Sequence, residues 1–327
     1  MNKLISALRI VFFVGAAGSL AALNCAIAAS YPSKPVRIIT TSLPGSATDV
    51  PARAVANRLT EVWGQQFIVD NRPGAGGQIA AEIASKTTPD GYTIFFSSDG
   101  PIAIIPAIKR RLPYDPLKDF EPVAFGDFNN YVLVVNPRLP VHSVSDLLAL
   151  AKRNPGKLSY GSAGVGSPNH MGMELFKFKA GIDLVHVPYK GGPAATTDLL
   201  AGQIDLAMLG PPSIPHIKAG RLRALAVPSA KRSEFLPDLP SIAETVPGVD
   251  VRTWGAFFAP AGTPKAILDK LHREITRQLN LPETKSLLAL QGLSVEAMTR
   301  GELRALLRAD TKKYVDLVRA IKMPLLD

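Results

Sequence analysis

The chain has 327 residues, of which 46% are hydrophobic and 20% are charged, and its formal net charge is +10. This length exceeds the usual size of one domain and the composition excludes global disorder, so we expect two domains with a sizeable core. The Lys and Arg residues form no block and do not alternate with aromatic residues. This pattern argues against a nucleic-acid partner and favours attraction to anionic solutes or a membrane surface.

The segment 1–29 has the pattern of a secretory signal peptide. Lys3 and Arg9 precede an apolar run, and Ala26-Ile-Ala28 has the small-x-small form of a cleavage site. A membrane anchor is the alternative, but the run is interrupted by Gly and Ser and is short for a span. We therefore expect export to the periplasm, with a mature charge of +8 after the +10 chain loses these two cations.

Cys25 is the only cysteine and lies inside this segment. A mature chain would have none, which excludes disulfides and cysteine metal sites. A lipoprotein signal would have Leu three positions before the cysteine and a small residue directly before it, where this chain has Ala22 and Asn24. Lipidation is therefore the weaker alternative.

After the signal peptide, strands, glycine-containing turns and helices alternate, which predicts parallel βαβ units. The expected strands are 36–40, 67–70, 92–96, 123–125, 131–135, 158–160, 183–187, 202–208, 222–227 and 254–258. The expected helices include 78–86, 143–152, 193–200, 265–279, 283–291 and 301–320. In such folds ligands collect beyond the carboxyl ends of the strands. The turns 41–48, 97–101 and 161–167 are therefore expected near these edges.

The chain is expected to cross between two lobes twice, first near 126–131 and again after the strand 222–227. The predicted organisation is a signal peptide over 1–29, lobe I over 30–127, lobe II over 128–227 and the second part of lobe I over 228–327. Two crossings favour two lobes that are hinged over a cleft.

The stretch 157–170 has the pattern of a short strand, a loop of small residues and the start of a helix. Its glycines permit a tight turn, and Ser167-Pro168 supplies an N-cap and a first-turn proline. Such a junction leaves peptide N–H groups unpaired at the positive end of the helix, where an anion can bind. A glycine turn without a ligand is the open alternative. The loop has no Lys or Arg, so backbone dipoles and hydroxyls would hold the anion.

Several segments in this order resemble the Bug-type solute receptors of tripartite tricarboxylate transporters. The most specific are Asn71-Arg-Pro-Gly-Ala-Gly-Gly77 and His186-Val-Pro-Tyr-Lys-Gly191, and the others are 31–37, 44–49, 89–92, 112–120 and 259–264. The resemblance covers essentially the whole mature chain. It implies an α/β, two-lobed periplasmic binding protein of type II (Venus-flytrap) that acts as a monomer, closes on an organic acid and delivers it to a membrane permease, without a cofactor or metal.

The resemblance also implies that the carboxylate is held between the first loop and the Ser/Gly loop of the second domain. The candidate ligand-binding residues are Ser42, Gly45, Ser46, Ala47, Thr48, Ser98, Asp99, Ser162, Gly164, Val165, Gly166, Ser167, His170, Leu209 and Gly210. Asp49 is expected to support the first loop and the start of its helix. Tyr189 and Lys190 are expected either to line the edge of the cleft or to be exposed to solvent at their turn.

This sequence departs from the family pattern at three places. Ser42 replaces a common aromatic residue, and Ser46 replaces a usual glycine and adds a hydroxyl that can bond a carboxylate. Leu209-Gly210 stands where the family often has Asp-Asn. The absence of these two polar residues at 209 and 210 favours a ligand with an apolar distal part, such as an aromatic or short aliphatic acid.

Catalytic and metal functions are disfavoured by the motifs. No two histidines have metal-ligand spacing, and Tyr160 breaks the G-x-S-x-G pattern around Ser162. We expect His142, His216 and His272 to be solvated, His186 to be packed, and His170 either to contact the ligand or to orient its loop. The alternatives to a transport receptor are a receptor for a sensor kinase and a secreted hydrolase.

Overall fold

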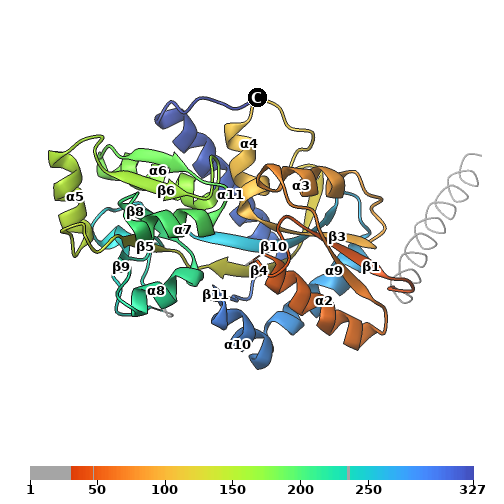
Figure 1. Ribbon diagram of the computed structural model, residues 1–327. Coiled ribbons are helices and arrows are strands. Elements are labelled where there is room, and N and C mark those ends of the chain that lie inside the picture. Colours follow the sequence, from red (N-terminus) through yellow and green to blue (C-terminus); the bar gives the residue numbers. More distant parts are fainter. Residues whose placement is uncertain (1–30, 47, 234–235) are drawn as a thin grey trace, which may run out of the picture.

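The computed structural model describes residues 31–46, 48–233 and 236–327 (Figure 1). The predicted signal peptide, Cys25 and Ala47 lie outside the described residues. Within the described part, the strands form two separate sheets. No helix in that part is both long enough and apolar enough to cross a membrane.

The first sheet has six strands in the order β11-β4-β10-β3-β1-β2. β1, β2 and β3 run parallel, whereas β10 runs antiparallel to both β3 and β4, and β11 runs antiparallel to β4. Its strands are β1 (Val36–Thr40), β2 (Phe67–Asn71), β3 (Thr93–Ser98), β4 (Phe120–Asn129), β10 (Thr253–Pro260) and β11 (Leu293–Ser294).

The second sheet has five strands in the order β7-β6-β8-β5-β9. Its strands are β5 (Val132–Val135), β6 (Ser159–Ser162), β7 (Val185–Pro188), β8 (Leu206–Leu209) and β9 (Arg223–Ala226). β6 lies between the parallel strands β7 and β8, as β1 lies between β2 and β3 in the first sheet. The strand, loop and helix unit that begins at β1 and the one that begins at β6 therefore take the same place in their sheets.

Helices cover both faces of each sheet (Figure 1). They are α2 (Asp49–Trp63), α3 (Gln78–Ser85), α4 (Ile105–Ile108), α5 (Val144–Arg153), α6 (Pro168–Ala180), α7 (Gly192–Ala201), α8 (Ile214–Lys218), α9 (Lys265–Leu279), α10 (Pro282–Leu290) and α11 (Arg300–Ala320). In β1, Ile38 packs in the cluster that contains α2 and α9, and Ile39 packs in the cluster that contains α3 and α11. Strands buried on both faces explain the nearly continuous apolar runs in the sequence.

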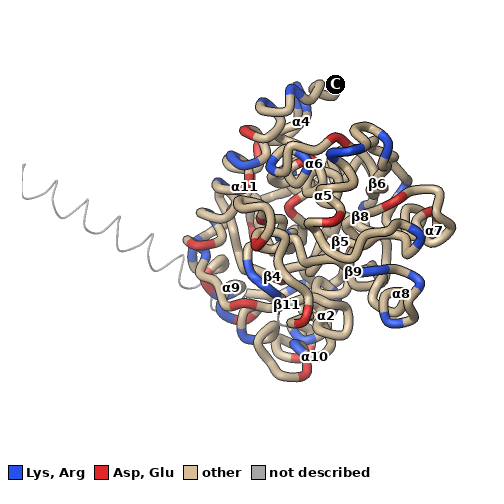
Figure 2. Tube along the Cα trace, turned by 90° about the vertical axis from the view of Figure 1, so that its left-hand side faces the viewer, with Lys and Arg blue, Asp and Glu red and all other residues tan. Residues whose placement is uncertain are grey.

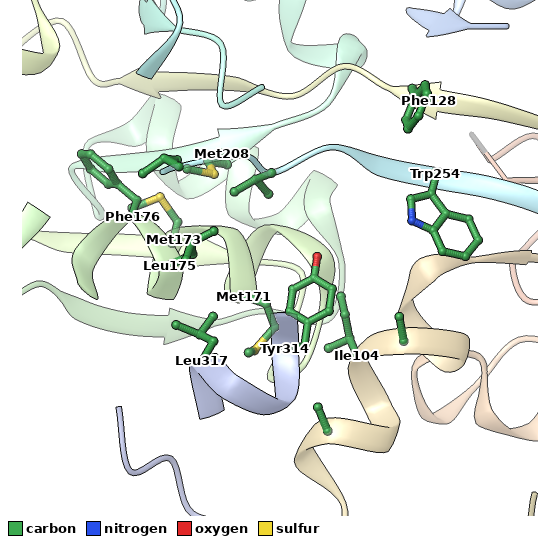
Figure 3. Packing of buried hydrophobic residues seen from close by; sticks show 14 of the residues in the cluster. Ile104, Phe128, Met171, Met173, Leu175, Phe176, Met208, Trp254, Tyr314 and Leu317 are labelled. Carbon is green, nitrogen blue, oxygen red and sulfur yellow. The ribbon is translucent and has the colours of Figure 1, made fainter. Parts of the chain in front are cut away.

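One hydrophobic cluster continues from one sheet to the other. Ile104 precedes α4, Met171 lies in α6, and Tyr314 and Leu317 lie in α11; Figure 3 shows these side chains beside one another. Because α6 belongs to the second half and Ile104 to the first, this packing joins the two halves. It also fixes where the loop before α6 lies.

The ends of several elements differ from the sequence expectations. β4 begins three residues before the expected strand and ends four residues after it, at Asn129. β8 begins only at Leu206, because Gly202 ends α7 in a left-handed conformation. The expected turn 97–101 leads instead into a helical segment, with a π-helical turn (Gly100–Ile104) followed by α4. Apolar residues bury this segment almost completely, so tertiary packing overrides its two prolines.

The chain passes from the first sheet to the second between Asn129 and Val132, and it returns between Ala226 and Thr253. The division into lobe I over 30–127 and 228–327 and lobe II over 128–227 stays a prediction. In the ribbon of Figure 1 the elements of the second sheet lie on the left and those of the first on the right.

Candidate functional site

The loops after β1 and β3 leave the first sheet at the same edge. Thr40 pairs with Phe96 in parallel register, so the chain continues into Ser42 and Ser98 from neighbouring positions. Thr40 also pairs with Asn71 of β2, which begins the glycine turn 71–77. A Cβ added to Gly77 would lie 3.0 Å from both Thr41 and Pro101, so this turn packs between the two loops.

Asp49 organises the first loop, as the sequence analysis expected. Its buried carboxylate accepts hydrogen bonds from the Gly45 amide (2.8 Å), from Asn71 Nδ2 (2.8 Å) and from the Arg53 guanidinium (2.9 and 3.1 Å). Asn71 Nδ2 also donates to the Ser42 carbonyl at 2.8 Å. Burial raises the pKa of Asp49, but these hydrogen bonds outweigh it and hold the pKa below its usual value. The group stays an anion and keeps the loop folded onto α2.

This arrangement uses some of the donors that were expected for a ligand. The Gly45 amide donates to Asp49, and the Ser46 hydroxyl accepts a 3.3 Å hydrogen bond from the Asp49 amide. In the described part of this loop, the amides of Ser42, Leu43 and Thr48 have no acceptor. They are the donors that an anion can reach without displacing an internal bond.

Asp99 is a candidate that the structure places out of reach of solvent. Its side chain is fully buried, and among the described residues neither carboxylate oxygen has a hydrogen-bond partner. The hydroxyl of Tyr314 lies nearby, also without a well-aligned partner. Burial and the neighbouring Asp310 carboxylate raise the pKa of Asp99 well above its usual value. Ser98, in contrast, remains half-buried at the edge of the sheet.

The Ser/Gly loop after β6 is held by its own side chains. Asn169 Oδ1 accepts from the Ala163 amide (3.3 Å) and from the Ser167 hydroxyl (2.8 Å), and Ser162 Oγ accepts from the Gly164 amide (3.1 Å). His170 Nδ1 accepts from the Gly166 amide at 3.1 Å. Ser167 occupies the expected N-cap position of α6, but its one hydroxyl proton is shared between Asn169 Oδ1 and the Gly164 carbonyl (2.6 Å), and the hydroxyl makes no cap hydrogen bond.

Three amides at this junction remain for an anion. Over the described residues 161–170, the amides of Val165, Asn169 and His170 have no acceptor. The amides of Asn169 and His170 belong to the first turn of α6, where the helix dipole favours negative charge. Only part of the Ser/Gly loop therefore has amides that are available to bind an anion.

The second loop contacts the first half of the chain directly. A Cβ added to Gly166 would lie only 2.2 Å from Ile108 Cδ1 in α4, and Gly166 has a φ of +78° that side chains rarely adopt. Because α4 follows the turn after β3, this contact places the second loop beside the helical segment that begins near Ser98. The candidate loops thus come from both halves of the molecule.

The two remaining candidates lie at the end of β8. The Leu209 side chain is buried in a cluster with Val132, Val134 and Leu199, so it packs in the core of the second half. Gly210 lies against Tyr131, whose ring would be 3.4 Å from an added Cβ. We therefore keep Gly210 in the proposed site and treat Leu209 as a core residue.

Large apolar side chains are exposed at the tip of each loop. Leu43 is 65% exposed and Val165 is 52% exposed. Neither loop contains Lys or Arg. Figure 2 shows the cationic and acidic residues spread over both halves of the trace. The site thus offers backbone amides, hydroxyls and apolar tips.

A cavity of about 540 Å³ lies elsewhere, between the end of β4, the segment after β9 and the segment around β11. None of the candidate residues lines it. Arg252 stacks over the Phe128 ring there, 4.6 Å from its centroid, and also pairs with Asp250.

The histidines differ partly from expectation. His142 is exposed, whereas the prediction of solvated side chains is wrong for the half-buried His216 and His272; His272 Nδ1 lies 2.8 Å from the Val123 carbonyl.

His186 Nε2 lies 2.7 Å from Ser162 Oγ, a spacing that would suit a nucleophile and its base. However, Ser162 is fully buried, and no carboxylate among the described residues bonds His186. The described residues also contain no group of three or more potential metal ligands.

Four residues support the two loops although the sequence did not indicate this role: Arg53, Asn71, Asn169 and His186. Arg53 and Asn71 hold Asp49, while Asn169 and His186 hold the second loop. Asn71 and Asn169 both stand inside segments that the sequence singled out, so polar residues beside glycine turns were the available signal. Tyr189, which the sequence placed at the cleft edge or in its turn, donates its hydroxyl to Asp198 at 2.7 Å.

Comparison with known proteins identifies the family. The model of the tripartite tricarboxylate transporter family receptor matches residues 51–323. The chain is 34% identical over 322 residues to the protein BugT of Bordetella pertussis, covering 98% of this chain and 97% of BugT. It is 36% identical over 292 residues to a protein encoded in the tcbD-tcbE intergenic region of Pseudomonas sp. strain P51, covering 88% and 87% of the two chains.

Solved structures agree with this assignment. R. palustris Rpa4515, solved with adipate, has a TM-score of 0.82 and 34% identity, covering 90% of this chain and all of the other. MatC from Rhodopseudomonas palustris, solved with bound malate, has a TM-score of 0.77 and 27% identity, covering 88% of this chain and all of the other. The two-sheet α/β architecture is therefore that of periplasmic binding proteins. The chain belongs to the receptor family of tripartite tricarboxylate transporters, as a Bug-type periplasmic receptor for carboxylates.

Proposed function

We propose that this receptor binds an aliphatic dicarboxylate with an apolar chain, of the size of adipate, between the first loop and the Ser/Gly loop. The observation that carries the proposal is the combination at each loop of unpaired amides with an exposed apolar tip, Leu43 or Val165, and no cation. Such a surface can bond a carboxylate and also cover methylene groups. The adipate bound by a relative of 34% identity supports the same ligand class.

Ligand capture in this proposal involves no covalent chemistry. The carboxylate binds the amides at one loop and gains contacts with the second loop when the lobes close, so the ligand stabilises the closed state by its differential affinity. The closed receptor then delivers the acid to the membrane permease. Export through the segment 1–29 and a monomeric receptor complete the proposal.

Calorimetry with adipate, malate, citrate and benzoate tests the ligand class. We expect adipate to bind and to raise the Tm, because a ligand that binds only the native state stabilises it by mass action. Tight citrate binding without adipate binding would contradict the apolar-chain assignment. Hydrolysis or other turnover of an added acid or ester would contradict the receptor function itself.

A matched pair of variants tests whether the ligand binds beside the Ser/Gly loop. V165D places a carboxylate at the tip of the second loop, where like-charge repulsion should weaken adipate binding at least about tenfold. V62D makes the same change at a residue that is 43% exposed near the end of α2, about 20 Å along this helix from the first loop. Equal affinities of the two variants would exclude the Val165 loop from the site.

Transport is tested in cells. Deletion of the gene should abolish uptake of labelled adipate, and the wild-type gene should restore it. Unchanged uptake together with loss of an adipate-induced transcriptional response would instead indicate a receptor that serves a sensor kinase.

A further inference from the structure

Three rings form a continuous stack behind the Ser/Gly loop. The His170 and His186 rings lie 4.1 Å apart with an interplanar angle of 25°, and His186 and Tyr160 lie 4.8 Å apart at 16°. Tyr160 is fully buried and His170 is 3% exposed, whereas His186 is half-buried. The rings come from β6, β7 and α6, the three elements that meet at the loop.

Each histidine bonds one side of the loop. His170 Nδ1 accepts a hydrogen bond from the Gly166 amide at 3.1 Å, so this nitrogen carries no proton. The neutral ring therefore has its proton on Nε2. His186 Nε2 lies 2.7 Å from Ser162 Oγ, and either atom can be the donor. Protonation of His186 preserves a hydrogen bond to Ser162. Protonation of His170 at Nδ1 removes its hydrogen bond to Gly166.

The surroundings of the stack favour neutral imidazoles. Burial, together with the nearby His186 and Lys177, lowers the pKa of His170 to about 4, although the Glu174 carboxylate opposes this shift. Burial also lowers the pKa of His186. Glu174 accepts from Tyr160 Oη (2.5 Å) and from Lys177 Nζ (2.8 Å), so its charge is already compensated. The charged and titratable groups around the pair are therefore Tyr160 from β6, Glu174 and Lys177 from α6, and the other histidine.

We propose that His170 is a positioning residue for ligand binding: its neutral ring holds the Gly166 amide and thereby aims the unpaired Val165 amide at the carboxylate. His186 fixes the His170 ring by stacking and holds Ser162 on the other side of the loop. His170 does not touch the ligand with its side chain in this arrangement. The inference rests on the proposed function, because it concerns the same loop.

Two substitutions separate the hydrogen bond from the stack. H170N keeps an oxygen close to the place of Nδ1 and can accept from Gly166, whereas H170F keeps a stacking ring without an acceptor. We expect H170F to weaken adipate binding at least about tenfold and H170N to remain within about threefold of wild type. Retention of affinity by H170F, or equal losses in both variants, would overturn the positioning role.

The pH dependence of adipate affinity is a second test, because a purely structural role of His170 would not change it. Adipate affinity of the wild type should fall between pH 6 and pH 4 as His170 gains a proton, and this part of the fall should be absent in H170N. An identical pH profile in both proteins would contradict the proposal.

Amide hydrogen exchange of Gly166 separates this inference from the proposed function, because it is measured without ligand. Exchange should be slow in the wild type and in H170N and fast in H170F, while the amides of the α6 interior keep their wild-type rates as evidence of folding. This exchange pattern in a protein that binds no dicarboxylate would contradict the proposed function but leave the hydrogen-bond role of His170 intact. Slow exchange of Gly166 in H170F would overturn that role.

Discussion

At the scale of single residues, two glycines have the same φ but different surroundings, so substitutions at them distinguish the cost of backbone strain from the cost of a steric clash. Gly45 and Gly166 both have a φ of +78°, but an added Cβ meets nothing within 4 Å at Gly45 and lies 2.2 Å from Ile108 Cδ1 at Gly166. Strain in the left-handed region costs about 1–2 kcal/mol at either position. Only Gly166 adds a clash with a buried side chain.

We therefore predict that G166A lowers the free energy of unfolding by clearly more than G45A. The substitution I108V removes the clashing Cδ1 atom, so G166A/I108V should recover most of the excess loss. Urea denaturation of the single and double variants measures the coupling. Additive effects of G166A and I108V would show that the two residues are not in contact.

The buried Asp99 carboxyl gives a residue-scale prediction for pH. Burial and Asp310 raise its pKa in the folded protein, so between its unfolded pKa of about 3.9 and its folded pKa the folded state binds more protons than the unfolded state. The stability that this group contributes is full below about pH 3.9 and is lost as the pH rises. D99N should therefore stabilise the protein at pH 7.5 by about 1 kcal/mol or more, with a much smaller effect at pH 4.

Urea denaturation at the two pH values measures this difference. The exposed Asp238, changed to Asn, is the matched control and should have a small effect at both pH values. Destabilisation by D99N at both pH values would show that the carboxylate is paired in the native state.

At the scale of elements, α11 connects the two halves of the molecule. Leu317 is 4% exposed and belongs to the cluster that also contains Ile104 of the first half and Met171 of α6 (Figure 3). L317A should lower the free energy of unfolding by about 2–5 kcal/mol, because it leaves a cavity in a shared core. L290A, at a position that is 83% exposed, should change it by less than about 0.5 kcal/mol.

The fluorescence of the buried Trp254 can follow the unfolding of α11, because its indole donates a hydrogen bond to Asp310 of this helix at 2.7 Å. Its fluorescence and the circular dichroism should follow one shared transition in the wild type. A wild-type stability in L317A would contradict the packing role of α11.

The periodicity of apolar residues predicted most elements, because strands and helices buried on one or both faces leave a clear pattern. It predicted the three C-terminal helices to within one residue at each end. It missed α4, since the prolines Pro101 and Pro106 mark the segment as a turn, whereas packing against α11 and other distant elements stabilises the helix. The ends of β4 and β8 depend on pairing partners far away in the sequence.

The candidate site was less accessible to sequence reasoning. The loop positions followed from glycines and small residues, but the sequence does not reveal which amides are already bonded. The side chains of Asp49, Asn169 and His170 occupy several of the donors. Likewise, Leu209 looks like a cleft residue in the sequence, and only the sheet shows that it faces the core.

At the scale of the whole molecule, the proposal requires the two loops to approach each other when the acid binds. The positions of Leu43 and Val165 suit spin labels, because both are exposed and the only native cysteine lies in the predicted signal peptide. In the mature protein carrying L43C and V165C, adipate should shorten the distance between the labels and narrow its distribution. A control pair in one half, V62C and I68C, should show no change; an unchanged Leu43–Val165 distance at saturating adipate would contradict closure.

The most direct test of the central claim is a crystal structure of the protein with adipate. We predict one carboxylate between the two loops, within hydrogen-bond distance of the Val165 amide and the first turn of α6, with Leu43 and Val165 against the methylene chain. A ligand bound elsewhere, or held mainly by Arg or Lys side chains, would contradict the account.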